Sequence, residues 1–136
     1  MEAIIPYLTF NGQATEALDF YAKALNGNIE SKQTFADAKM EIAEEHKNNI
    51  LHAVLKAGDL TMMFSDSGNK DEVTSGTNLS LSLNFNVLEE MEKTFEALSQ
   101  GGKITMPLQD TFWGARFGML TDKFGFHWMF NHDLKK

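Results

Sequence analysis

The sequence contains no cysteine, which excludes disulfide bonds, thiolate metal sites and a cysteine nucleophile. Long apolar runs are also absent, because no stretch approaches the roughly 20 residues that a membrane-spanning helix needs. The first ten residues lack the basic segment of a secretion signal, and Pro6 interrupts their short apolar run. We therefore expect a cytoplasmic protein that does not enter a membrane.

Basic charge is scarce as well. The chain has 12 Lys and Arg against 19 Asp and Glu, a net charge of -7, and its basic residues are scattered. Proteins that bind nucleic acid neutralise phosphates with clustered Lys and Arg, so we expect no nucleic-acid partner. With 136 residues, 43% of them hydrophobic, the chain is long enough for a globular domain with its own core.

Two segments have the apolar spacing of amphipathic helices, residues 13–26 and 88–100, and a glycine follows each of them. A strand-like run precedes each helix, at 3–10 and 79–85. Three more strand-like runs follow each helix, at 28–36, 50–57 and 60–65 in the first half and at 103–111, 115–121 and 126–131 in the second. The predicted order of elements is therefore βαβββ, twice.

The second half of the chain repeats features of the first. Sliding the sequence by 75 residues superposes residues of the same type: Phe10 on Phe85, Phe20 on Phe95, and Gly27 on Gly102. A duplicated unit is the simplest explanation. We predict an α+β fold in one domain, residues 1–136, built from two βαβββ modules at about 1–65 and 79–136, with residues 66–78 as a polar linker.

The strand predicted at 79–85 has two different sides. Alternation places its leucines on one side and Ser80, Ser82 and Asn84 on the other. We expect the leucine side to pack against the helices. The polar side is then either exposed to solvent or part of the lining of a ligand cleft.

Residues 111–130 are predicted to form two strands joined by a turn. Asp122 and Gly125 occupy the first and fourth positions of that turn, where a type I turn favours these residue types. Gly118, inside a strand, indicates a close backbone approach or room for a large neighbour. The aromatic residues that follow are predicted to lie in the core or in an interface: Phe124, Trp128 and Phe130.

Arg116, in the same segment, has two possible roles. Its planar guanidinium can bind a carboxylate or phosphate of a ligand. It can equally form a salt bridge with one of the acidic residues of the chain. The sequence leaves both roles open.

One motif covers much of this segment, W-G-x-R-x-G-x-x-x-D-x-F-G-x-x-W, from Trp113 to Trp128. With this motif and the start Pro6-Tyr7-Leu8, the chain resembles the PhnB-like branch of the vicinal oxygen chelate superfamily. That superfamily includes glyoxalase I, extradiol dioxygenases and bleomycin-resistance proteins. The resemblance implies two modules whose curved mixed sheets surround a cleft, and it implies a homodimer. Lys123 and Phe126 depart from the branch, which usually has proline and histidine at these positions.

This branch is often labelled as a methyltransferase of ubiquinone biosynthesis. The residues do not support that activity, because the sequence has no glycine-rich strand–turn–helix loop to hold a nucleoside cofactor. We expect no such cofactor.

Enzymes of the superfamily hold a divalent metal with four side chains, from the first and last strand of each module. The resemblance puts these positions at Pro6, Met63, Ser80 and Met129. None of the four is His, Glu or Asp, and such a set does not hold a cation that prefers oxygen ligands. We therefore expect no metal.

Other side chains of the sequence are candidate metal ligands. His127 shares a strand side with Met129, and we interpret it as a hydrogen-bonded cleft or core residue. His52 alternates with apolar neighbours and is predicted to be structural. The acidic run between two strands is predicted to be a solvated loop: Glu41, Glu44, Glu45 and His46.

We therefore interpret the chain as a metal-free small-molecule-binding protein with an unknown ligand and no identifiable catalytic residue. The predicted ligand contacts come from both modules: Met63, Ser80, Ser82, Asn84, Trp113, Arg116, His127 and Met129. One alternative is a divalent-metal-dependent lyase or dioxygenase of the same superfamily, with ligands among His52, His127, Glu30 and Glu41. Another is an interaction module whose cleft is filled by its own side chains.

Overall fold

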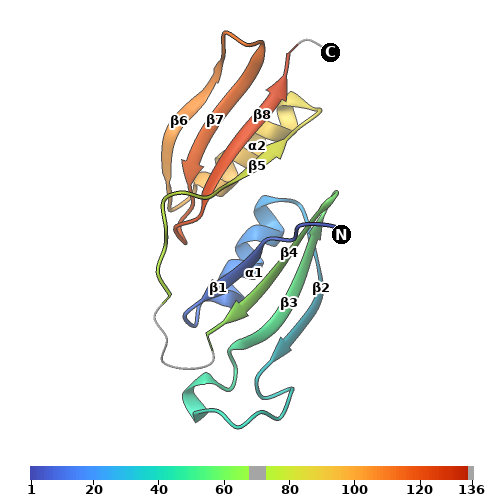
Figure 1. Ribbon diagram of the computed structural model, residues 1–136, viewed down its shortest axis with the longest axis vertical. Coiled ribbons are helices and arrows are strands. Elements are labelled where there is room, and N and C mark those ends of the chain that lie inside the picture. The colour runs from blue at the N-terminus through green and yellow to red at the C-terminus, as the bar shows by residue number, and fades with distance from the viewer. Residues whose placement is uncertain (68–72, 135–136) are drawn as a thin grey trace. The chain divides into compact units, whose positions relative to one another are not determined.

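The computed structural model describes residues 1–67 and 73–134 and consists of two compact units, Met1–Thr74 and Ser75–Lys136 (Figure 1). Each unit contains a four-stranded mixed sheet and one helix in the order βαβββ, which confirms the predicted fold class. Part of the predicted linker, residues 68–72, lies outside the described residues, and Asp66 belongs to the strand before it.

The elements of the first unit are β1 (Tyr7–Phe10), α1 (Ala14–Ala24), β2 (Asn28–Thr34), the 3₁₀ turn η1 (Glu44–His46), β3 (Ile50–Ala57) and β4 (Leu60–Asp66). Those of the second are β5 (Ser80–Asn84), α2 (Leu88–Ser99), β6 (Lys103–Asp110), β7 (Ala115–Thr121) and β8 (His127–Asp133). The sheets have the same topology, β1-β4-β3-β2 and β5-β8-β7-β6. In each sheet the first two strands in this order are parallel, and the other neighbours are antiparallel.

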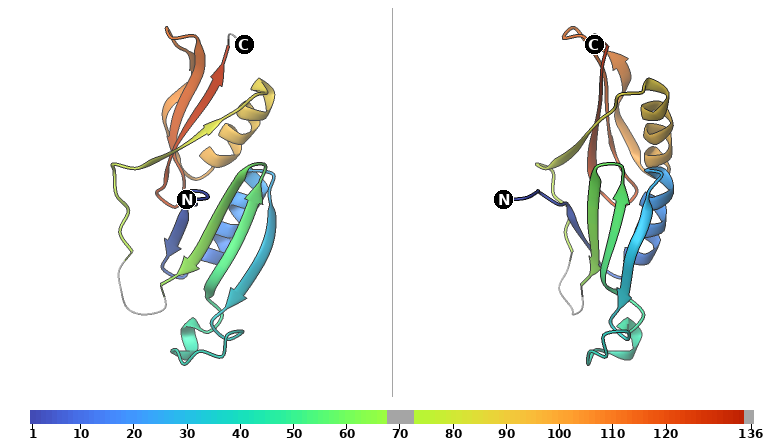
Figure 2. Two further views of the ribbon diagram at one scale, coloured as in Figure 1. Left: turned by 45° about the vertical axis from the view of Figure 1, so that its right-hand side comes forward. Right: turned by 90° about the vertical axis from the view of Figure 1, so that its right-hand side faces the viewer.

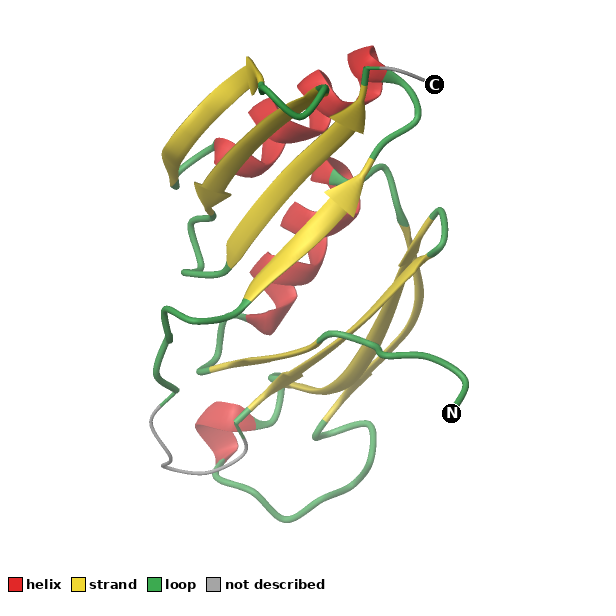
Figure 3. Ribbon diagram, turned by 45° about the horizontal axis from the view of Figure 1, so that its top comes forward, coloured by secondary structure: helices red, strands yellow, loops and turns green. Residues whose placement is uncertain are grey.

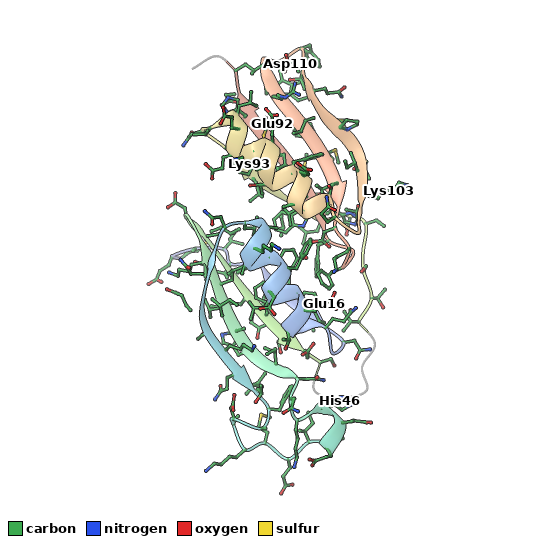
Figure 4. The ribbon with its side chains drawn as sticks, turned by 180° about the vertical axis from the view of Figure 1, so that it is seen from behind. Glu16, His46, Glu92, Lys93, Lys103 and Asp110 are labelled. Carbon is green, nitrogen blue, oxygen red and sulfur yellow. The ribbon has the colours of Figure 1, made fainter. Side chains whose placement is uncertain are left out.

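In each unit the helix covers one side of the sheet and leaves the other side open (Figures 2 and 3). The outward sides of the helices carry charged residues, with Glu16 on α1 and Glu92 and Lys93 on α2 (Figure 4). The inward sides bury apolar residues such as Leu18 and Leu98, both fully buried. We call the side of each sheet opposite its helix the open face.

The repeat seen in the sequence is also present in the packing. Phe10 stacks on Phe64 with ring centroids 6.1 Å apart, and Phe85 stacks on Phe130 at 5.8 Å. Phe64 and Phe130 occupy equivalent places in β4 and β8, and both are fully buried. The superposition of Phe10 on Phe85 is therefore confirmed.

In the packing, the residue of α1 equivalent to Phe95 is Tyr21, one position after the Phe20 that the shift superposes. Tyr21 is the helix residue that contacts Phe64, at 5.8 Å, as Phe95 contacts Phe130 at 5.0 Å. The reason is that α2 has 12 residues and α1 has 11, so a fixed offset that fits the helix ends fails at their starts.

Gly27 and Gly102 are equivalent, and both are needed for the same steric reason. A Cβ at Gly27 would lie 2.8 Å from the carbonyl oxygen of Lys56 in β3. A Cβ at Gly102 would lie 2.3 Å from the carbonyl oxygen of Thr121 in β7. Each glycine therefore lets the chain leaving the helix pass close to the third strand of its sheet.

Asp66, at the end of β4, joins three segments of the first unit. Its carboxylate is 2% exposed and accepts N–H bonds from Gly12 and Ala14, at the start of α1, and from Ile50, at the start of β3, all at 2.9 Å. A carboxylate at a helix N-terminus satisfies N–H groups that have no partner within the helix. Asp66 thus fixes α1 and β3 to the end of β4.

Candidate ligand-binding site

The candidate site is the open face of the second sheet. Gly118 lies on the other side of this sheet, which faces the helix, because a Cβ at Gly118 would lie 3.0 Å from the Phe95 ring of α2. Leu120, Trp128 and Phe130 share that side through the strand pairing, and all three are buried, as predicted for Trp128 and Phe130. The residues that alternate with them therefore lie on the open face.

Six of the eight predicted contact residues lie together on or beside this face. The parallel pairing of β5 with β8 sets Ser80 opposite His127 and Ser82 opposite Met129. Asn84 continues the row and accepts a hydrogen bond from Asn131 at 3.2 Å. Trp113, the sixth, precedes β7 and packs against Phe117 on this face.

Two apolar residues of the face, Phe117 and Met119, were not among the predicted contacts. Phe117 and Met119 of β7 are half-buried, and Met119 lies opposite Met129. Trp113 packs edge-on against Phe117, with ring centroids 5.9 Å apart, and Phe112 packs against Trp113 at 5.0 Å. The signal was available, because alternation from Gly118 puts Phe117 and Met119 on the other side of β7.

His127 makes two hydrogen bonds within the protein. Its Nδ1 lies 2.9 Å from the Thr121 hydroxyl, and its Nε2 lies 2.8 Å from the carbonyl oxygen of Gly76. A carbonyl oxygen only accepts, so Nε2 carries a proton and donates. His127 therefore ties the segment before β5 to the end of β7, and both ring nitrogens are engaged.

Arg116 lies on the helix side of β7, with Gly118 and Leu120. Its Nη1 donates to the Asp110 carboxylate at 3.1 Å, and both side chains are partly exposed. Of the two roles left open by the sequence, the structure shows the salt bridge. It does not bring Arg116 together with the polar row of β5.

Met63, the remaining predicted contact, belongs to the first unit. It lies on the open face of that sheet, opposite Tyr7 of β1 and Val54 of β3. This face also carries His52, which is half-buried and hydrogen-bonded to the Tyr7 hydroxyl at 3.1 Å. His52, predicted to be structural, therefore links β3 to β1 through this contact.

The aspartate and glycine of the sequence motif build the turn between β7 and β8. Gly125 donates its N–H to the Asp122 carbonyl at 3.0 Å and has a φ of 92°, which favours glycine. The Asp122 carboxylate accepts the N–H groups of Phe124 at 2.8 Å and Phe126 at 3.1 Å, and the indole N–H of Trp128 at 2.8 Å. This part of the motif therefore holds the turn and the core together.

The chemistry of the side chains does not suit the divalent metal of the superfamily. In each unit the first and last strands pair in parallel, which sets Tyr7 opposite Met63 and Ser82 opposite Met129. Pro6 precedes β1 and contributes only its carbonyl, which accepts the Met63 N–H. The side chains at the four positions that the resemblance gives are a proline, a hydroxyl and two thioethers, which are poor ligands for a hard cation. Across residues 1–67 and 73–134, no three His, Asp or Glu side chains are arranged to hold a metal.

The acidic segment between β2 and β3 is a separate feature. Lys47 pairs with Glu44 at 2.8 Å, and His46 lies 3.5 Å from Glu45. Glu41 lines an open pocket of about 400 Å³ in this loop. Glu30, a further candidate of the metal-dependent alternative, is exposed on β2.

At the start of the same loop, a backbone hydrogen bond and a side-chain hydrogen bond with Thr34 lower the pKa of Asp37 below its ordinary value of 3.8. Asp37 and Thr34 bond reciprocally, since the Thr34 N–H donates to the Asp37 carboxylate and the Asp37 N–H donates to the Thr34 hydroxyl. This pair shapes the turn that leaves β2.

Two mixed sheets of identical topology, each with one helix after its first strand, give the chain the fold expected from the resemblance to the vicinal oxygen chelate superfamily. The fold is similar to that of the genomically encoded fosfomycin resistance protein FosX from Listeria monocytogenes, with a TM-score of 0.64. The match covers 97% of this chain and 93% of that one at 12% identity, so it shows the fold alone.

The chain belongs to the family whose model, described as 3-demethylubiquinone-9 3-methyltransferase, matches residues 2–130. The crystal structure of protein PA1353 from Pseudomonas aeruginosa is 41% identical, with 98% of each chain covered and a TM-score of 0.87. The putative 3-demethylubiquinone-9 3-methyltransferase, PhnB protein, from Bacillus cereus is 27% identical, with 96% of this chain and 99% of that one covered and a TM-score of 0.80. The resemblance inferred from the motif is therefore confirmed.

No helix in the described part of the chain is long and apolar enough to cross a membrane.

Proposed function

We propose that the protein binds a small molecule on the open face of the second sheet without a metal or other cofactor. The observation that carries the proposal is the row of polar side chains on β5 beside aromatic and methionine side chains of β7 and β8. Binding sites for small molecules typically combine an apolar floor with a few polar groups that fix orientation. This face has both parts.

The side chains suggest the chemistry of the ligand. Met119 and Met129 are flexible and adapt their shape to an apolar partner. Ser82 and Asn84 are exposed at the edge of the sheet and supply hydroxyl and amide groups. We propose a mainly apolar ligand with a few hydrogen-bonding atoms.

Binding without catalysis is the form of the proposal that the residues favour. Ser80 lies opposite His127, but the two ring nitrogens of His127 bond to Thr121 and Gly76, so the histidine is not paired with Ser80 as a base. The methyltransferase activity belongs to the family description and to the Bacillus cereus protein as it is named. We do not carry it over, because the sequence has no loop to hold a nucleoside cofactor.

The proposal includes two finer points. A homodimer is proposed from the resemblance to the superfamily. A cytoplasmic location is proposed because the chain has no cysteine, as proteins of reducing compartments need none.

The test is a fragment-library screen by NMR on the ¹⁵N-labelled full chain, followed by titration of each binding fragment against two variants. Ser82→Arg puts a large charged side chain into the polar row, whereas Gln100→Arg adds the same charge at the end of α2, away from the open face. We expect fragments to shift the amides of Ser82, Phe117 and Met129, and Ser82→Arg alone to weaken binding at least tenfold. Equal effects of the two variants would refute the assignment of the site.

A further inference from the structure

The polar row on the open face of the second sheet ends in a hydrogen-bond network of three side chains. Asn84, the last residue of β5, lies opposite Asn131 of β8. The Asn131 NH₂ donates to the Asn84 side-chain oxygen at 3.2 Å and to the Asp133 carboxylate, also at 3.2 Å. Asn131 and Asp133 are two residues apart in β8, so they lie on the same side of the sheet.

Asp133 fixes the direction in which the two amides point. A carboxylate only accepts hydrogen bonds, so the Asn131 group that faces it must be the NH₂ and not the carbonyl. Both protons of that NH₂ are then engaged, one by Asp133 and the other by Asn84. Since the Asn131 NH₂ donates, the Asn84 atom that faces it must be the carbonyl oxygen. The orientation of both amides therefore follows from one carboxylate.

The network leaves one acceptor and one donor group unused. Within the described residues, neither the Asn131 carbonyl oxygen nor the Asn84 NH₂ has a hydrogen-bond partner. Asn84 is exposed and Asn131 is half-buried, so a ligand on the open face can reach both. An amide group is the complement of this pair, because its N–H donates to the Asn131 oxygen and its carbonyl accepts from the Asn84 NH₂.

An aromatic surface adjoins the network. Phe117 of β7 lies directly opposite Asn131, and side chains at such positions are neighbours on one face of a sheet. Trp113 packs edge-on against Phe117 and is 57% exposed, so part of its ring is available to a ligand. Aromatic rings pack favourably against a further ring, either offset-stacked or edge to face. A flat ring that carries an amide therefore matches both parts of the face.

The chemistry of the network disfavours a charged ligand. A ligand carboxylate has no proton to donate to the Asn131 oxygen, and it would lie near the Asp133 carboxylate, which repels it. An ammonium group has no acceptor for the Asn84 NH₂. An uncharged amide satisfies both side chains.

We infer that the open face of the second sheet takes an uncharged aromatic molecule whose ring carries an amide, either as a carboxamide or as a lactam. The inference rests on the function proposed above and adds the chemical class of the ligand. Asn84 and Asn131 bind the amide, and Asp133 is a positioning residue that acts through Asn131.

The test compares three probes of similar size by NMR titration of the ¹⁵N-labelled full chain: benzamide, N,N-dimethylbenzamide and benzoate. Dimethylation removes the N–H donors and keeps the ring and the carbonyl, and benzoate replaces the amide by an anion. We expect benzamide to bind at least about fivefold more tightly than either of the others, as one hydrogen bond contributes. Benzamide should also shift the side-chain NH₂ signals of Asn84 and Asn131.

The failure of this inference can be told apart from the failure of the proposed function. Equal affinity of the three probes for the open face would overturn the amide specificity and leave small-molecule binding at this face intact. If no probe shifts the amide signals of Ser82, Phe117 or Met129, both the inference and the proposed function are contradicted.

Two variants test the residues. Asn84→Ala removes the free donor and should weaken benzamide binding roughly fivefold, whereas Asn28→Ala removes an exposed amide in the first unit and should not. Asp133→Ala releases the Asn131 amide, so the preference for benzamide over N,N-dimethylbenzamide should shrink, which a purely structural role of Asp133 would not cause. Equal effects of Asn84→Ala and Asn28→Ala, or a full preference in Asp133→Ala, would overturn the assigned roles.

Discussion

Replacing Asp122 by asparagine should destabilise the second unit, although the two side chains have nearly the same shape. One carboxylate oxygen accepts the N–H groups of Phe124 and Phe126, and the other accepts the indole N–H of Trp128. Asparagine has only one acceptor oxygen. If that oxygen keeps the hydrogen bonds to the two backbone N–H groups, the amide NH₂ faces the indole N–H. Two hydrogen-bond donors then face each other with no acceptor between them.

The magnitude follows from burial. Asp122 is 3% exposed and Trp128 is 1% exposed, so water cannot replace the lost acceptor at the indole. A buried polar group without a hydrogen-bond partner costs about 1–3 kcal/mol. In the variant, the amide NH₂ and the indole N–H both lack an acceptor. We expect Asp122→Asn to lower the free energy of unfolding by about 2–4 kcal/mol.

The assay is urea unfolding followed by tryptophan fluorescence, which reports on the second unit because Trp113 and Trp128 both lie there. Asp110→Asn is the matched control, since it removes a carboxylate whose pair with Arg116 is partly exposed and should cost less than about 1 kcal/mol. In the double variant Asp122→Asn with Trp128→Phe, the indole donor is absent and no longer faces the amide. The loss of unfolding free energy should therefore be about 1–2 kcal/mol smaller than the sum of the losses in the two single variants. Equal losses for Asp122→Asn and Asp110→Asn would refute the reasoning.

Three further predictions concern other parts of the chain. Gly102→Ala should lower the free energy of unfolding by about 3 kcal/mol, because its Cβ would meet a backbone carbonyl, and an unchanged urea midpoint would contradict this. Trp113→Ala should weaken fragment binding about fivefold, whereas Phe112→Ala, at a side chain 97% exposed, should not; equal losses in NMR titrations would contradict the site. Because the pKa of Asp37 is lowered, its contribution to stability is present above the ordinary pKa and is lost as pH falls through the folded-state value. Thr34→Ala keeps the backbone hydrogen bond, which is the larger cause, and removes the side-chain one, so it should raise the pKa of Asp37 in a ¹³C NMR titration; no change would contradict the side-chain contribution.

Local patterns predicted the fold well because the unit repeats. Helical spacing, alternation in the strands and the glycines after each helix all pointed to two βαβββ modules. The polar row of β5 followed from alternation alone, since Ser80, Ser82 and Asn84 had to share a side. A single shift of 75 residues has its limit in the helices, where Phe95 is equivalent to Tyr21 and not to Phe20, because α2 is longer than α1 by one residue.

Features that depend on long-range pairing could not be predicted from the sequence. The bond between Tyr7 and His52 joins residues 45 apart, and the sequence contains nothing that brings them together. The alternation of β7 was visible, but only the contact of Gly118 with α2 shows that Arg116 lies on the helix side. Likewise, Asp66 collects N–H groups from two separate segments, and no local motif marks it as buried.

The central claim is that the open face of the second sheet binds a small molecule without a metal. The most direct measurement compares the dissociation constant of one fragment from the screen in protein stripped with a chelator and in protein supplied with divalent ions in turn. The account predicts the same dissociation constant in all samples, with the shifted amides centred on Ser82 and Met129. Binding that is lost with the chelator and restored by one ion would contradict it.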